Sequence, residues 1–94
     1  MTNDNTADIK GFIEFLEKQR LDDGKTKVLN DSITPNMLYR YYYVYSKGKT
    51  IWVFEKSISK ILISFGIFHK MQGALKFSQT HYNDFLKLME GAGK

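Results

Sequence analysis

The sequence predicts one small domain of the mostly helical α+β class, in which a β-hairpin and a short last helix follow the main helices. Apolar residues recur at helical spacing in several segments before residue 66, and two strand-like runs follow that residue. With 94 residues and 43% hydrophobic residues, the chain is long enough for one core. We therefore expect a single domain over residues 1–94, with an ordered core at about 7–90 and frayed ends.

The first helix is predicted from Ala7 to Arg20. Thr6 or Asp8 can cap its start, and the polar run 22–25 ends it. Its apolar positions fall at i, i+3, i+4 and i+7, on one face: Ile9, Phe12, Ile13 and Leu16. After it, Val28, Leu29 and Ile33 give a weak signal for a short strand.

The second helix begins at the sharpest boundary in the sequence, Thr34-Pro35, where Thr suits the N-cap and Pro suits the first helical position. It runs to about Ser46 and ends at Lys47-Gly48, with Gly48 expected at the C′ position. Leu38, Tyr41 or Tyr42, and Tyr45 form its inner face. The tyrosines of this helix have three possible roles, namely core packing, stacking on unpaired bases and contact with a protein partner. We expect core packing, with Tyr42 and Tyr45 in the core, Tyr39 half-buried, and Tyr41 and Tyr43 along the surface.

The third helix is predicted from about Val53 to Phe65, and Gly66 ends it. Its apolar stripe is Phe54, Ile58, Ile61, Leu62 and Phe65. Trp52 lies between the two helices. We expect it to seal the turn over the core, and contact with a ligand is the alternative role.

The end of the chain predicts a hairpin and a last helix. Residues 67–72 and 75–82 read as strands joined at Gly73-Ala74. Asn83-Asp84 can cap a helix that packs back on the core, and residues 91–94 should fray. The apolar residues of this last helix are Phe85, Leu86, Leu88 and Met89.

Positive charge concentrates on the segment from Ser32 to Asn83, where basic residues outnumber acidic ones by seven to one. Residues 1–31 sum to about −2 and the tail from Asp84 is neutral. The seven cations are Arg40, Lys47, Lys49, Lys56, Lys60, Lys70 and Lys76, and the lone acid is Glu55. This concentration is typical of a surface that binds polyanions, and the order helix, turn, helix, hairpin predicts a winged helix-turn-helix.

The third helix presents lysines and short hydroxyl residues, with Ile63, on the face opposite its core stripe. Lysines neutralise phosphates, and serines can donate to phosphates or base edges. An ordinary solvated face is the alternative for the helix alone, but the turn and the hairpin add further cations. The predicted DNA-binding residues are Lys47, Lys49, Lys56, Ser57, Ser59, Lys60, Ser64, His69, Lys70 and Lys76. Because the helix lacks Arg, Asn and Gln, we expect phosphate-dominated binding of modest specificity, with duplex favoured over single-stranded DNA.

Two stretches resemble the winged helix at the C-terminus of poxvirus D5-type primase-helicases and of their phage and plasmid relatives, a family similar to the eukaryotic RFX DNA-binding domain. The stretches are residues 38–45 (LYRYYYVY) and 58–67 (ISKILISFGI). The shared pattern maps onto Leu38, Tyr39, Tyr42 and Tyr45, then onto Ile58, Lys60, Leu62, Phe65, Gly66 and Ile67. The resemblance covers about residues 33–82. It implies DNA binding through helix and wing, in transcription regulation or in replication of a virus, phage or mobile element.

Other classes of function have little support in the sequence. There is no cysteine, no phosphate-binding glycine loop and no hydrolase or zinc-protease motif, so we expect no enzyme and no cofactor. His69 and His81 alone would make a poor metal site. The polar N-terminus and the interrupted apolar run 58–68 predict an intracellular protein with no membrane segment, in the cytoplasm or, in a eukaryote, the nucleus. The alternative function is a protein-interaction module on the same fold, which would dimerise or bind a host factor through exposed tyrosines and Ile63.

Overall fold

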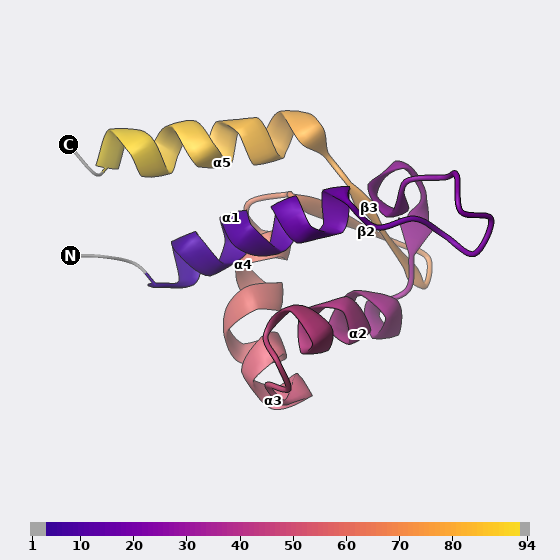
Figure 1. The fold of residues 1–94 in the computed structure, drawn as a ribbon. Coiled ribbons are helices and arrows are strands. Elements are labelled where there is room, and N and C mark those ends of the chain that lie inside the picture. The colour runs from indigo at the N-terminus through magenta and orange to yellow at the C-terminus, as the bar shows by residue number, and fades with distance from the viewer. Residues whose placement is uncertain (1–3, 93–94) are drawn as a thin grey trace.

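Helices and a small antiparallel sheet alternate along the chain, which confirms the predicted α+β class (Figure 1). The computed structural model describes residues 4–92, and side chains within residues 8–90. The helices are α1 (Asp4–Glu17), α2 (Pro35–Tyr45), α3 (Ile51–Val53), α4 (Ser59–Ser64) and α5 (Gln79–Ala92). A 3-10 turn η1 (Val28–Asn30) and a π-helical turn η2 (Phe54–Ile58) complete the helical elements, and the strands are β1 (Ser32–Ile33), β2 (Phe68–Met71) and β3 (Ala74–Phe77).

The sheet has the strand order β1-β3-β2, so the hairpin of β2 and β3 is joined by a short strand that lies far upstream in the sequence. Ser32 pairs with Lys76 and Ile33 with Leu75. Of the weak strand signal at residues 28–33, only Ile33 joins a strand, because Val28 and Leu29 form the 3-10 turn. Both nevertheless lie in the core, so their apolar character serves packing rather than sheet pairing.

The core forms where α1, α2, the helix at residues 51–64, the sheet and the start of α5 meet. The predicted face of α1 is buried completely, with Ile9, Phe12, Ile13 and Leu16 all 0% exposed. Phe12 meets Tyr42 of α2 edge to face, with ring centroids 5.2 Å apart. Gly11 permits this approach of α1 to α2, because a Cβ there would overlap the hydroxyl of Tyr45.

The tyrosines of α2 divide only partly as expected, because Tyr45, which the sequence placed in the core, and Tyr41, which it placed along the surface, are both partly buried. Tyr42 is 0% exposed, and its hydroxyl donates to Oδ2 of Asp8 at 3.1 Å. Tyr39, Tyr41 and Tyr45 are partly buried against the core, and Tyr43 is 49% exposed. The start of α2 is also confirmed, because Thr34 Oγ1 accepts from the backbone N–H of Met37 at 3.1 Å.

Helix α1 differs from the prediction at both ends. It begins at Asp4 rather than Ala7, and it ends at Glu17 rather than Arg20. Arg20 instead forms an isolated antiparallel bridge with Lys27 across the loop that follows the helix. Asp8 lies inside the helix and bonds to α2, so it does not cap the start. The side chain of Thr6 lies outside those described.

The start predicted for the last helix was wrong by at least five residues, because the predicted cap was Asn83 or Asp84 and the observed cap is Ser78. Strand β3 ends at Phe77, and Ser78 caps α5 by accepting the backbone N–H of His81 at 3.3 Å. Asn83 and Asp84 are exposed positions within the helix. Helix α5 also includes Gly91 and Ala92, which the sequence assigned to a frayed tail, and the rest of that tail lies outside the described residues.

Candidate nucleic-acid interface

The turn between α2 and α3 holds two lysines in a defined backbone geometry. The N–H of Gly48 donates to the carbonyl of Tyr43 at 2.9 Å, and that of Lys47 donates to the carbonyl of Val44 at 3.2 Å. These two bonds are the Schellman pattern of a helix C-terminus. The sequence predicted that Gly48 would occupy the left-handed C′ position. Lys47 occupies it instead, with φ +61°, followed by Gly48 at φ +105°.

Lys47 is therefore in a conformation that glycine adopts much more readily. A left-handed backbone costs a non-glycine L-residue roughly 1–2 kcal/mol. Among the described residues, Lys47 is the only one other than glycine with a positive φ. Strained backbone positions cluster at functional sites, so Lys47 is a candidate functional residue.

The next helix runs without a break from Ile51 to Ser64, with the π-helical turn η2 between the α-helical segments α3 and α4. Thr50 caps it by accepting the N–H of Val53 at 3.4 Å. Phe54, Ile58 and Leu62 face the core, as the predicted stripe requires. Ile61 is only partly buried, and Phe65, just after the helix, is 38% exposed, with its ring 5.0 Å from that of Phe85.

The exposed ridge of this helix follows a spacing of four residues. Its members are Trp52, Lys56, Lys60 and Ser64. Ser57, Ser59 and Ile63, which the sequence placed on the same outward face, are partly buried at its sides. Two of the three predicted serines are therefore less accessible to a ligand than Ser64.

Trp52 is not a core residue, contrary to the prediction. It is 64% exposed, because Phe54 takes the buried position and lies 5.1 Å from Tyr42, ring to ring. Because a helix turns by about 100° per residue, Trp52 lies on nearly the opposite side of the helix from Phe54, two residues later. Nζ of Lys56 lies 4.8 Å from the indole centroid, a cation–π contact. Trp52 precedes Lys56 and Lys60 at intervals of four residues. This spacing is the sequence signal that could have placed Trp52 on the exposed ridge.

Further contacts tie the turn to the exposed aromatic residues around it. The Tyr39 hydroxyl donates to the carbonyl of Lys49 at 3.2 Å, and the Lys49 N–H donates to Ser46 Oγ at 3.2 Å. Tyr43 lies beside Tyr39, with ring centroids 6.1 Å apart. We call this region the basic–aromatic corner: Tyr43, Lys47, Lys49, Trp52 and Lys56.

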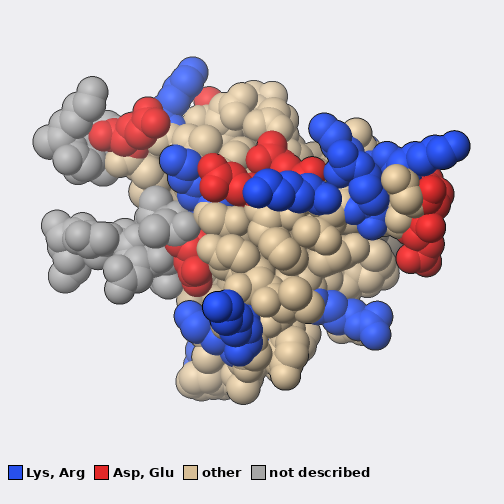
Figure 2. Space-filling model, viewed as in Figure 1, with Lys and Arg blue, Asp and Glu red and all other residues tan. Residues whose placement is uncertain are grey.

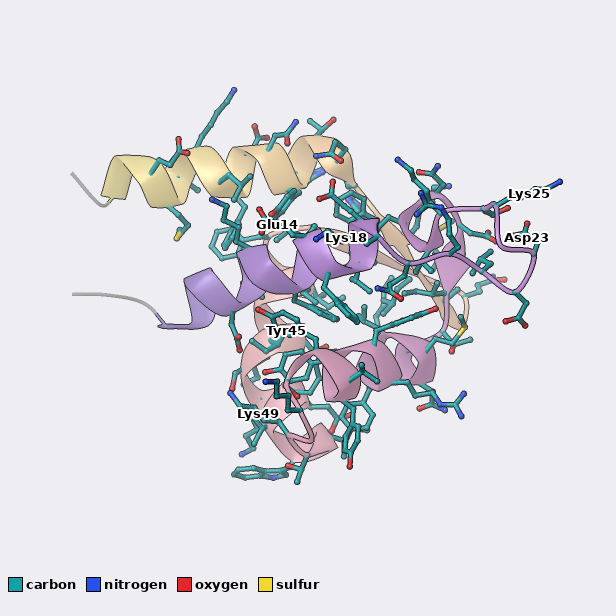
Figure 3. All side chains as sticks on the ribbon, viewed as in Figure 1. Glu14, Lys18, Asp23, Lys25, Tyr45 and Lys49 are labelled. Carbon is teal, nitrogen blue, oxygen red and sulfur yellow. The ribbon has the colours of Figure 1, made fainter. Side chains whose placement is uncertain are left out.

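On the face seen in Figure 2, blue atoms gather beside the α2–α3 turn, and a smaller group of red atoms lies above them, toward α1. Figure 3 places Lys49 at this turn, whereas Glu14 lies on α1 and Asp23 on the distant loop. Glu55 is the one acidic residue on the helix at residues 51–64. Within the described part of the chain, no ion pair engages the lysines of the corner or Lys60, so their charges are available to a ligand.

The hairpin divides its predicted site residues between two faces. Lys76 pairs with His69, whereas Lys70 pairs with Leu75. Because neighbouring residues of a strand point to opposite faces, Lys70 lies on the core side of the sheet and Lys76 on the outer side. Lys76 also borders a shallow depression of about 310 Å³ whose other residues include Glu17 and Lys27. Lys70, exposed near the hairpin turn, is thus the hairpin lysine on the side of the sheet that carries the helices.

The two histidines meet on the outer face of the sheet. His69 Nε2 and His81 Nδ1 are 3.5 Å apart, and Ser78 Oγ lies 2.7 Å from the same His81 nitrogen. Gly66 makes room for this arrangement, because a Cβ at that position would lie 2.8 Å from Cδ2 of His81. No cluster of three or more metal-ligating side chains occurs among the described residues.

Comparison with known proteins gives no relative. No family model, no curated protein and no solved structure matches the chain. Among the helices of residues 4–92, none is long and apolar enough to cross a membrane.

Proposed function

We propose that this domain is a winged helix-turn-helix that binds DNA, with the helix at residues 51–64 docked on the duplex and the β2–β3 hairpin as its wing. The observation that carries the proposal is the unpaired cationic surface formed by the corner and Lys60. The element order and the strand order β1-β3-β2 support it, because they put a helix-turn-helix directly before a hairpin.

The chemistry of the ridge favours contact with phosphates over reading of bases. Lysines neutralise phosphates as point charges, and the ridge offers no Arg, Asn or Gln for bidentate contact with a base. We therefore propose modest sequence preference and strong salt dependence. If four lysines each neutralise one phosphate, the slope of log affinity against log salt is about −3.6.

The resemblance to the D5-type and RFX-like winged helices supports the same proposal and extends it to a biological role. We propose that the domain acts in transcription regulation or in replication of a virus, phage or mobile element.

The test is fluorescence anisotropy with a labelled duplex across a salt series. The double variant Lys56→Glu/Lys60→Glu should lose at least tenfold in affinity, because each substitution replaces an attraction to phosphate with a repulsion. The matched control is Lys18→Glu/Lys87→Glu, which makes the same change of charge at exposed positions just after α1 and on α5. Equal losses in the two variants, with unchanged circular dichroism, would show that net charge matters and that the ridge does not.

A second candidate is a protein-interaction module, and the exposed apolar side chains around the corner favour it. Tyr43, Val44, Ile51 and Trp52 are 49%, 64%, 43% and 64% exposed. Exposed aromatic residues are common anchors of interfaces. Sedimentation velocity over a range of concentrations separates the two candidates, because self-association through this patch would raise the mass with concentration in the absence of DNA.

A further inference from the structure

We infer that Trp52 stacks on an unpaired base, so that the corner prefers DNA with a single-stranded end or gap beside the duplex. This inference rests on the proposed function and names the DNA structure that the same site selects.

The first support is that the fold holds a large aromatic surface in solvent at a fixed place. Trp52 lies in the first turn of its helix, which the Thr50 cap fixes. Phe54 anchors the same turn in the core, with its ring 5.8 Å from that of Tyr39. The indole is therefore presented outward by a rigid element and is not part of a mobile loop.

The second support is the chemistry around the indole. Lys56 lies over the ring, and Lys47 and Lys49 belong to the turn just before the helix. Binding sites for single strands combine cations that follow the backbone with aromatic rings on which bases stack. A protein partner that covered the indole would also need acidic groups for these lysines, whereas a nucleotide carries the base and the phosphate together.

The third support concerns which bases can reach the indole. In a continuous duplex each base is stacked on both faces by its neighbours, so only a terminal, unpaired or flipped base can accept an indole. A duplex with an overhang satisfies both parts of the site, because the paired region supplies phosphates to Lys56 and Lys60 while the overhang supplies a free base.

Trp52 is the sole tryptophan, so its fluorescence reports directly on the inference. We would titrate the protein with a blunt duplex, the same duplex with an overhang, and the single strand, and follow labelled-DNA anisotropy and indole emission. Wild-type protein should bind the overhang duplex roughly tenfold more tightly than the blunt one, the order expected for one stacked base. The indole emission of Trp52 should be quenched more strongly by the overhang duplex than by the blunt one.

Variants complete the test. Trp52→Ala should remove the preference for the overhang, and Trp52→Phe should retain part of it because a phenyl ring also stacks. Leu88→Ala, which truncates another exposed apolar residue at 57% exposure, should leave the preference unchanged. Circular dichroism should be the same for all four proteins, since both substituted side chains are exposed.

The outcomes separate this inference from the proposed function. Salt-dependent binding with no preference for the overhang and no quenching would overturn the inference and leave DNA binding in place. An absence of binding to any of the three DNAs at low salt would overturn the proposed function and the inference with it. Concentration-dependent self-association that Trp52→Ala abolishes would assign the indole to a protein interface instead.

Discussion

Replacing Lys47 with glycine should stabilise the domain while weakening its proposed affinity for DNA. Lys47 has φ +61° at the C′ position of α2. Glycine removes the left-handed penalty of roughly 1–2 kcal/mol, but it adds about 0.4–1 kcal/mol of conformational entropy to the unfolded chain. The balance is a gain of about 0.5–1 kcal/mol. At about 4–8 °C per kcal/mol for a domain of this size, Tm should rise by roughly 2–8 °C.

The matched control for this substitution is Lys49→Gly, two residues along the same turn. It removes the same charge and adds the same entropy to the unfolded chain, yet Lys49 has no positive φ to relieve. We therefore expect Lys49→Gly to lose about 0.4–1 kcal/mol of stability. Thermal unfolding followed by circular dichroism measures both changes.

Affinity should respond in the opposite direction for Lys47→Gly. Loss of one phosphate contact makes the salt slope shallower by about 0.9, which anisotropy across a salt series measures. The reasoning is refuted if Lys47→Gly lowers Tm to the same extent as Lys49→Gly, because the turn would then hold no backbone strain.

Two further predictions concern the tyrosines of the core. Tyr42→Phe removes the hydrogen bond to Asp8 and should cost about 1 kcal/mol in urea unfolding, whereas no change would mean that the bond adds nothing to stability. Burial, followed by the negative charges of Glu14 and Glu17, raises the pKa of Tyr82 to about 12. Because the pKa is higher in the folded state, the contribution of neutral Tyr82 to the free energy of unfolding is fully present below pH 10. This contribution falls by on the order of 2 kcal/mol as the pH rises toward 12. Tyr82→Phe should flatten this alkaline loss, which urea titrations at several pH values would measure.

Local signals predicted the helices well where capping and periodicity agreed. Thr34-Pro35 marked the start of α2 because Thr suits the N-cap and Pro suits the first helical position. The buried face of α1 was predictable because four apolar positions between Ile9 and Leu16 fall on one side of the helix. The start of α5 escaped prediction because residues 77–82 also suit a strand. Strand β1 pairs with β3, which lies more than forty residues later in the sequence, and no local pattern encodes this pairing.

The candidate site was only partly predictable, for two physical reasons. Hydrophobicity alone assigns an indole to the core, and only the helical register against Phe54 turns Trp52 outward. The hairpin register decides which lysines share a face, and this register separates Lys70 from Lys76. The sequence therefore identified the residue types of the proposed DNA-binding surface but not their grouping.

The basic–aromatic corner departs from what folding alone would favour at three neighbouring places. Lys47 occupies a glycine conformation, the helix that follows widens to a π-helical turn at residues 54–58, and Trp52 lies in solvent. π-helical turns and strained backbone positions concentrate at functional sites, where a local cost is retained because the site requires it. None of these features depends on counting charges, yet all three lie where the unpaired lysines gather. Local conformational cost and unpaired positive charge therefore coincide at the corner, and this coincidence supports the proposal that the corner carries the function of this chain.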